Sequence, residues 1–257
     1  MNVCRPYFAA ALLAVMAPFS SVHAAGTDAA NGRQLVSRYA DAIVGIELVV
    51  TLRLKMGDRE APPREQRIEV NGTVISKDGL TVTTLGAVDP QATLQAMGSG
   101  SGGRGPEIVG SDFKEVKLRL ADGRELPARF VLKDADLDLA FMAPETPDAS
   151  REFAHVKLEE SVEGGLLEDF YFLARAPKTL QRVPLLRKIQ VIGVVERPRR
   201  FYLMSEQAPG SPVFSADGRV LGITLQHFTN GTRAGFVVLP SADIAEMAKQ
   251  AVTAQAR

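Results

Sequence analysis

Few side chains in this sequence could act as a nucleophile, a base or an acid. Ser211 follows a glycine and precedes a proline, and Asp138 ends a run of three aspartates spaced two residues apart. The histidines are His23, His155 and His227. A serine nucleophile is weak until a histidine takes its proton, and an aspartate orients that histidine. These residue types together would indicate acyl-transfer chemistry.

The same residues do not predict a metal site or a cofactor. Residues 134–145 superficially resemble a calcium loop, with alternating aspartates and Glu145 at the twelfth position. The sixth position of such a loop needs a glycine for its sharp turn, but here it is Leu139. A single cysteine, Cys4, excludes both an internal disulfide framework and a cysteine-based zinc cluster. We therefore predict no metal and no cofactor.

The composition is that of an ordinary globular protein. The chain has 257 residues, of which 46% are hydrophobic, and 30 Lys and Arg balance 30 Asp and Glu. This length allows one large or two small domains with a sizeable core. Zero net charge argues against a nucleic-acid-binding protein, which needs an excess of cations to neutralise phosphates. The apolar fraction excludes a charge-rich disordered chain.

The amino terminus is typical of an export signal. A basic start precedes an apolar run at residues 8–19, and small residues two positions apart predict cleavage after Ala24. The apolar run is too short for a stable transmembrane helix, although a retained membrane anchor is the alternative interpretation. We therefore expect residues 1–24 to be a signal peptide and residues 25–257 to form a periplasmic or secreted mature chain without a membrane span.

Short strand-like runs dominate the mature chain. They alternate apolar and polar residues or are rich in β-branched residues, and glycine-containing turns separate several of them. The predicted strands cover residues 43–54, 67–76, 80–84, 115–120, 128–133, 139–143, 170–174, 189–196, 201–204, 211–214, 220–226 and 235–239. Many short strands at close spacing favour an all-β barrel or sandwich. Residues 28–41 and 241–254 predict a short helix at each end.

Two stretches depart from this pattern. Residues 97–106 contain five glycines and predict a mobile surface loop. Residues 197–200 (RPRR) form a basic cluster in a turn. Such a cluster predicts either a solvated turn or a site for an anionic partner.

Three segments resemble the trypsin-like proteases of the HtrA/Deg type. Residues 71–88 resemble the family's glycine-containing strand, its Asp-Gly hairpin and the strand that ends in T-N-x-H-V-V. Residues 132–141 are similar to its D-x-x-x-D-L-A stretch, and residues 208–224 to its nucleophile loop G-[ND]-S-G-[GS]-P-V and the hairpin after it. The resemblance covers about residues 40–245. It implies two six-stranded antiparallel β-barrels of the trypsin/chymotrypsin fold.

The resemblance also implies a division of the chain into domains. The first barrel would occupy residues 42–146 and the second barrel residues 147–240. A helical arm at residues 25–41 would precede them, and a helix within residues 241–257 would follow. Family members commonly carry PDZ modules after this point. The sequence ends at the predicted helix, so we expect no PDZ module.

Only one catalytic position implied by the resemblance carries the expected residue. Asp138 occupies the position of the catalytic aspartate, but Gly86 stands where the histidine is expected. Pro209 stands where the nucleophilic serine is expected, and it also lacks the backbone N–H that would help form the oxyanion hole. Ser211 is a non-standard alternative nucleophile, with one of the two later histidines as its base. Without a catalytic histidine, we expect backbone or hydroxyl donors to satisfy Asp138.

These residues favour a binding function over catalysis. The resemblance, together with the missing histidine and serine, predicts an exported pseudoprotease. It would hold a peptide, or an unfolded or envelope protein, against a strand edge in the cleft between the barrels. One alternative is an HtrA-like serine endopeptidase with residual activity that uses Ser211. The other is a structural subunit of an envelope protein complex.

Overall fold

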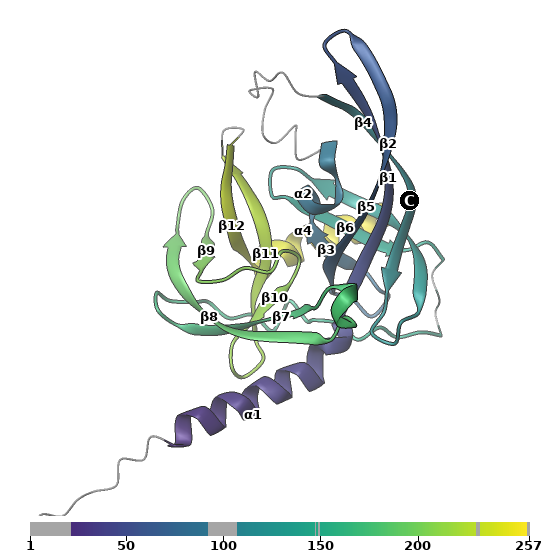
Figure 1. The fold of residues 1–257 in the computed structure, drawn as a ribbon. Helices are drawn as coiled ribbons and strands as arrows, with labels where there is room; N and C mark the ends of the chain where they lie inside the picture. The colour runs from purple at the N-terminus through teal and green to yellow at the C-terminus, as the bar shows by residue number, and fades with distance from the viewer. Residues whose placement is uncertain (1–21, 92–106, 147, 149, 230–231, 256–257) are drawn as a thin grey trace, which may run out of the picture.

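The protein folds into two β-barrels (Figure 1). The structure is a computed structural model that describes residues 22–91, 107–146, 148, 150–229 and 232–255. Within these residues the chain forms two closed six-stranded antiparallel barrels, with a helix before and a helix after them. The predicted all-β architecture of two six-stranded antiparallel barrels with a helix at each end is therefore confirmed. Residues 1–21 of the predicted signal peptide and the predicted glycine-rich loop at residues 97–106 lie outside the described residues.

The first barrel contains the strands β1 to β6. They are β1 (Ile43–Met56), β2 (Arg59–Val74), β3 (Thr81–Thr84), β4 (Glu107–Arg119), β5 (Glu125–Asp134) and β6 (Leu139–Pro144). Their order around the barrel is β1-β2-β3-β6-β5-β4. β1 buries every second residue from Val44 to Leu52, because successive side chains of a strand point to opposite faces. These alternate side chains form the core of the first barrel.

The β1–β2 hairpin is longer than the sequence predicted. The pattern predicted a break between Leu54 and Arg67, whereas β1 continues to Met56 and β2 begins at Arg59. The added residues of β2 are mostly exposed and polar and include two prolines, so they lack the alternation that marks a half-buried strand. Cross-strand pairing with β1 keeps them extended. Figure 1 shows this hairpin projecting beyond the barrel.

The second barrel contains the strands β7 to β12. They are β7 (Asp169–Arg175), β8 (Pro184–Val195), β9 (Phe201–Met204), β10 (Pro212–Phe214), β11 (Val220–Thr229) and β12 (Thr232–Pro240). Their order is β10-β11-β12-β9-β8-β7. A turn at residues 215–218 joins β10 to β11, and Gly218 adopts φ +87° there. A positive φ of this kind favours glycine.

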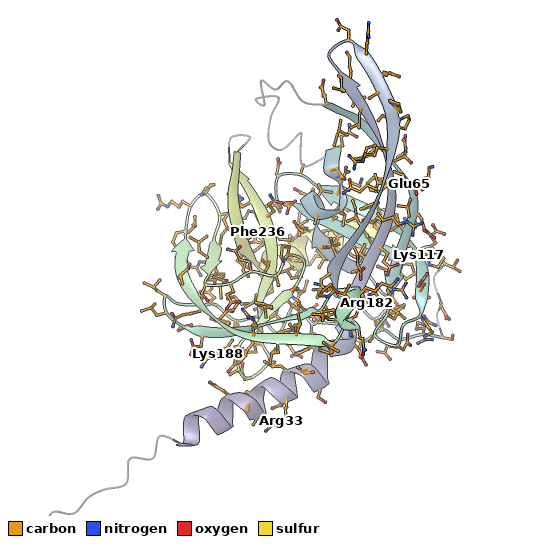
Figure 2. The ribbon with its side chains drawn as sticks, in the orientation of Figure 1. Arg33, Glu65, Lys117, Arg182, Lys188 and Phe236 are labelled. Carbon is orange, nitrogen blue, oxygen red and sulfur yellow. The ribbon has the colours of Figure 1, made fainter. Side chains whose placement is uncertain are left out.

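The β7–β8 hairpin fastens the second barrel to the first. Its connection contains the short helix η2 (Lys178–Leu180). The guanidinium of Arg175 donates to the carbonyl oxygens of Ala40 at 2.6 Å and of Ile43 at 2.5 Å. Arg182, labelled in Figure 2, forms an ion pair with Glu47 of β1 at 2.8 Å. Both arginines belong to the second barrel and bind groups at the start of the first, so the two barrels are held together at this end.

Helices before, within and after the barrels complete the fold. They are α1 (Val22–Tyr39), η1 (Ala40–Ala42), α2 (Leu85–Val88) and α4 (Ser241–Gln255). A shared apolar cluster joins Leu35 and Tyr39 of α1, Ile244 of α4 and residues of both barrels. The Tyr39 ring stacks on Phe214 with centroids 4.4 Å apart, and its hydroxyl donates to the Gly218 carbonyl. None of the helices in the described residues is both long and apolar enough to span a membrane.

Candidate functional site

Asp138 lies between the barrels, directly before β6. It follows a turn in which the Leu137 N–H donates to the Asp134 carboxylate at 2.9 Å, and it adopts φ +57°. A positive φ is uncommon for a residue other than glycine, although aspartate tolerates it better than most. Only 4% of Asp138 is exposed. The turn and the buried strand after it thus hold a carboxyl group away from solvent.

Donors from both barrels bind the Asp138 carboxylate. In the first barrel the Gly86 N–H donates to it at 2.6 Å, and the Thr84 hydroxyl donates as well. In the second barrel the Gln226 N–H donates to it at 2.8 Å. The predicted satisfaction by backbone and hydroxyl donors is therefore confirmed. Because it accepts from both sides, this carboxylate joins the two barrels at the site.

The electrostatic state of Asp138 follows from this burial. Burial raises the pKa of the Asp138 carboxyl to about 6, while the hydrogen bonds from Thr84, Gly86 and Gln226 act in the opposite direction. A carboxyl with this pKa is mostly ionised at neutral pH. Gly86 offers it a backbone N–H but has no side chain that could exchange a proton. Residue 86 therefore cannot serve as a base that the aspartate orients.

The loop before β10 is a tight turn. The Ser211 N–H donates to the Ala208 carbonyl at 3.0 Å, which closes a turn with Pro209 and Gly210 at its centre. Gly210 has φ +76°, as the third residue of a type II turn requires, and proline is favoured just before it. The Gly210 N–H donates to the Thr224 carbonyl at 2.8 Å. The N–H groups of residues 210 and 211 are thus engaged within the protein, and Pro209 has none.

The same turn contacts the first barrel closely. The Thr73 hydroxyl donates to the Gly210 carbonyl at 2.8 Å. A Cβ atom added at Gly210 would lie 2.2 Å from the Asn71 carbonyl oxygen and 2.7 Å from the Thr83 hydroxyl oxygen. Thr83 precedes Thr84 at the end of β3, so the turn that contains Pro209 packs on the strand that leads to Gly86. The structure thus places all three family-aligned positions where the barrels meet, and their catalytic equivalence stays a prediction.

Ser211 is not brought together with a histidine. It is fully buried, and its hydroxyl has no hydrogen-bond partner among the described residues, which include His155 and His227. The Nδ1 of His155 instead lies 2.9 Å from the Phe153 carbonyl oxygen. The rings of His227 and Phe201 pack together with centroids 4.7 Å apart, and burial lowers the pKa of His227. Within the described part of the chain, no three His, Cys, Asp or Glu side chains are grouped to hold a metal ion.

The sequence did not reveal two residues of this site. Gln226 acts through its backbone N–H, which any residue except proline provides, so its side-chain type carries no signal. Thr84 acts through its hydroxyl and ends the predicted strand that leads to Gly86, so a signal for it was present. The side-chain amide nitrogen of Gln226 is buried and, within the residues described, has no hydrogen-bond partner.

An unpaired strand edge begins beside the site. β11 pairs with β10 as far as Ile223, and the Thr224 N–H then donates to the Ser211 carbonyl at 3.0 Å. Beyond Thr224, no strand of the described residues pairs with this edge of β11. Backbone groups of alternate residues in a strand face the same edge, so those of Gln226 and Phe228 face it too. The Gln226 N–H is engaged by the Asp138 carboxylate, so the part of this edge that is open to another strand lies beyond it. The edge therefore continues from the Asp138 site toward the end of β11.

Comparison with known proteins gives a family match and similarities to solved structures. The family described as a trypsin-like peptidase domain matches residues 70–223, which include Gly86, Asp138, Pro209 and Ser211 but end before Gln226 and His227. A crystal structure of the MamO protease domain from Magnetospirillum magneticum, in its apo form, is similar at 17% identity and a TM-score of 0.49. That similarity covers 82% of this chain and 97% of the MamO chain. A search of curated proteins found no match.

Proposed function

The chain belongs to the trypsin-like peptidase family, and on this premise we propose that it is an exported pseudoprotease that binds an extended peptide or protein segment between its barrels. The export part of the proposal rests on the signal-like residues 1–24. It places the protein in the periplasm or outside the cell. The ligand would be a peptide, or an unfolded or envelope protein with an extended stretch.

The loss of catalysis is supported by the identity of the groups that donate to the Asp138 carboxylate. Peptide hydrolysis by a serine nucleophile needs a histidine between the acid and the serine. Here the carboxylate accepts the backbone N–H of Gly86 at 2.6 Å, and residue 86 has no side chain to relay a proton. Pro209 provides neither a hydroxyl group nor an N–H. If Gly86 and Pro209 are the equivalents of the catalytic histidine and serine, then base, nucleophile and one oxyanion donor are missing together, and we propose that the usual route of hydrolysis is lost.

The binding part of the proposal is supported by the free edge of β11. Extended peptides often bind by adding a strand to an exposed sheet edge, where main-chain hydrogen bonds supply affinity. The edge at Gln226 and Phe228 lacks a partner strand in the described residues and adjoins the junction of the barrels. A bound segment would run along β11 and past Asp138.

The catalytic part is tested with the purified protein, an unfolded protein substrate and a fluorophosphonate probe. We expect neither turnover nor covalent labelling, because the Ser211 hydroxyl has no hydrogen bond to a histidine of the described residues. Labelling or turnover that disappears in Ser211→Ala would instead establish a serine endopeptidase with a non-standard nucleophile. A known active trypsin-like protease in the same assay controls for probe and substrate quality.

The binding part is tested at Phe228. Phe228→Pro removes the backbone donor at the free edge, whereas Phe228→Ala keeps it. We expect peptides that bind the unaltered protein to lose affinity for Phe228→Pro and to retain it for Phe228→Ala. Thermal unfolding of both variants shows whether the fold is kept. Equal binding by the two variants would contradict strand addition at this edge.

A further inference from the structure

A cavity of about 420 Å³ opens between the barrels beside the Asp138 site. Asp136 and Leu137 line it from the first barrel, directly before Asp138 in sequence. His227 lines it from β11, directly after Gln226. The cavity therefore adjoins both the buried carboxylate and the free edge of β11. Its volume lies within the range of about 300–1,000 Å³ that is usual for ligand-binding pockets.

The interior of this cavity is largely apolar. Phe201 of β9 and Val237 of β12 line it, together with Leu137 of the first barrel. Phe236, labelled on β12 in Figure 2, is also part of the lining. The His227 ring packs against Phe201, and burial lowers the pKa of this histidine, which favours the uncharged form of the ring. Such a lining favours an apolar side chain.

Arg197, Pro198 and Arg199 of the basic turn at residues 197–200 line part of the cavity, which we call its mouth. The arginines of this turn differ in their partners. Arg200 donates to Glu163 at 2.7 Å and to Glu196 at 3.1 Å, and Arg199 pairs with Asp243 at 3.0 Å. Arg197 lines the cavity and forms no ion pair with any described residue. Of the two outcomes predicted for this cluster, Arg199 and Arg200 form local ion pairs, whereas Arg197 is available to an anion.

One acidic group also faces the cavity. Asp136 lines the first-barrel wall of the cavity. No ion pair among the described residues joins it to Arg197. The carboxylate of Asp136 therefore does not neutralise the Arg197 guanidinium directly. It does weaken the attraction of the mouth for anions through its own charge.

We propose that this cavity selects the segment bound at β11. It takes one apolar side chain of that segment, and Arg197 pairs with a carboxylate next to that side chain. The ligand class is thus an extended peptide with an apolar residue beside an acidic residue, or beside its own carboxyl terminus. The inference rests on the proposed peptide binding and adds a chemical preference to it.

The test uses synthetic peptides that differ at two positions, with binding measured by fluorescence anisotropy on the full chain. One peptide has Phe beside Glu, one has Phe beside Lys, one has Ala beside Glu, and one ends in Phe with a free carboxylate. We expect the Glu peptide to bind about three- to fivefold more tightly than the Lys peptide, as for a partly exposed ion pair. Replacing Phe by Ala should weaken binding roughly tenfold or more. Added salt should reduce the Glu preference but leave the Phe preference unchanged.

Variants of the mouth separate Arg197 from general charge effects. Arg197→Glu should reverse the preference to Lys, and Asp136→Asn should strengthen binding of the Glu peptide. Arg33→Glu is the matched control, because it makes the same change of charge on α1, outside the lining of the cavity, and should leave the preference unchanged. The peptide with a free terminus distinguishes a chain end from an acidic side chain as the source of the carboxylate.

The ways in which the proposal can fail are distinguishable. Equal affinity for the Glu and Lys peptides, with binding still lost in Phe228→Pro, would overturn the selectivity of the cavity and leave peptide binding in place. The selectivity would also be overturned if Arg33→Glu changed the preference as much as Arg197→Glu does. Absence of binding by every peptide would overturn the proposed function and this inference together.

Discussion

Asp138 and Ser211 are both buried polar residues at the junction of the barrels, but their surroundings are opposite. Asp138 is 4% exposed, and donors on Thr84, Gly86 and Gln226 all bind its carboxylate. Ser211 is 0% exposed, and its hydroxyl has no partner in the described residues. One group is satisfied from both barrels, and the other is enclosed without a hydrogen bond from the residues around it.

The difference between Asp138 and Ser211 indicates which of the two contributes hydrogen bonds to stability. A buried carboxylate is costly unless hydrogen bonds satisfy it, so its donors stabilise the place where it sits. A hydroxyl without a base or acceptor contributes no such bond and cannot be activated as a nucleophile. We infer that the Asp138 carboxylate and its donors connect the two barrels. The residues around Ser211 form a tightly packed turn, and its shape depends on Pro209 and Gly210.

The largest expected effect is on that turn. Gly210→Ala places a Cβ atom 2.2 Å from the Asn71 carbonyl oxygen and requires alanine at φ +76°. Overpacking and a left-handed residue together should lower the free energy of unfolding by roughly 3–5 kcal/mol. Urea unfolding followed by circular dichroism measures this loss.

A matched glycine separates the two causes. Gly123 has φ +85°, and no atom lies within 4 Å of its added Cβ. Gly123→Ala should therefore cost only the backbone strain, about 1–2 kcal/mol. Similar losses in Gly123→Ala and Gly210→Ala would show that the turn does not press on the first barrel as the distances indicate.

The next effect is a pH dependence carried by Asp138. Its pKa is raised in the folded state from 3.8 to about 6, so its stabilising contribution is present below 3.8 and is lost as pH rises through 6. This interval corresponds to roughly 3 kcal/mol of unfolding free energy. Asp138→Asn cannot titrate. The stability of the unaltered protein relative to Asp138→Asn should therefore fall between about pH 4 and about pH 6 and then level off.

Glu47 is a control, because its effect on stability should change with pH in the opposite direction. A hydrogen bond from Arg119 lowers the pKa of Glu47 from 4.5, so its contribution is lost as pH falls below that value. The stability of the unaltered protein relative to Glu47→Gln should rise with pH up to about 4.5 and stay level above it. A pH-independent difference between the unaltered protein and Asp138→Asn would contradict the raised pKa of Asp138.

Local signals in the sequence account for most of the fold. Alternation and glycine turns located the strands, as at Gly79, where φ is +86° in the turn before β3. The exposed half of β2 carries no alternation, because neither of its faces is buried, and only pairing with β1 extends it. The need of Asp138 for donors followed from its chemistry. The identity of one donor did not, because the Gln226 backbone N–H has no side-chain signature. The burial of Ser211 depends on how the two barrels pack, which no local pattern encodes.

The smallest expected change in stability is that of Ser211→Ala, in contrast to the effects expected at Asp138. Ser211→Ala removes a buried hydroxyl that has no partner among the described residues, so stability should change by less than about 0.5 kcal/mol or rise slightly. Thr73→Val is the matched control, because the buried Thr73 hydroxyl donates to the Gly210 carbonyl at 2.8 Å. Its loss leaves a buried carbonyl without this donor and should cost about 1 kcal/mol. Thermal unfolding of both variants measures the difference. A loss in Ser211→Ala as large as that in Thr73→Val would mean that the Ser211 hydroxyl has a bound partner, and the two sides of the site would then be alike.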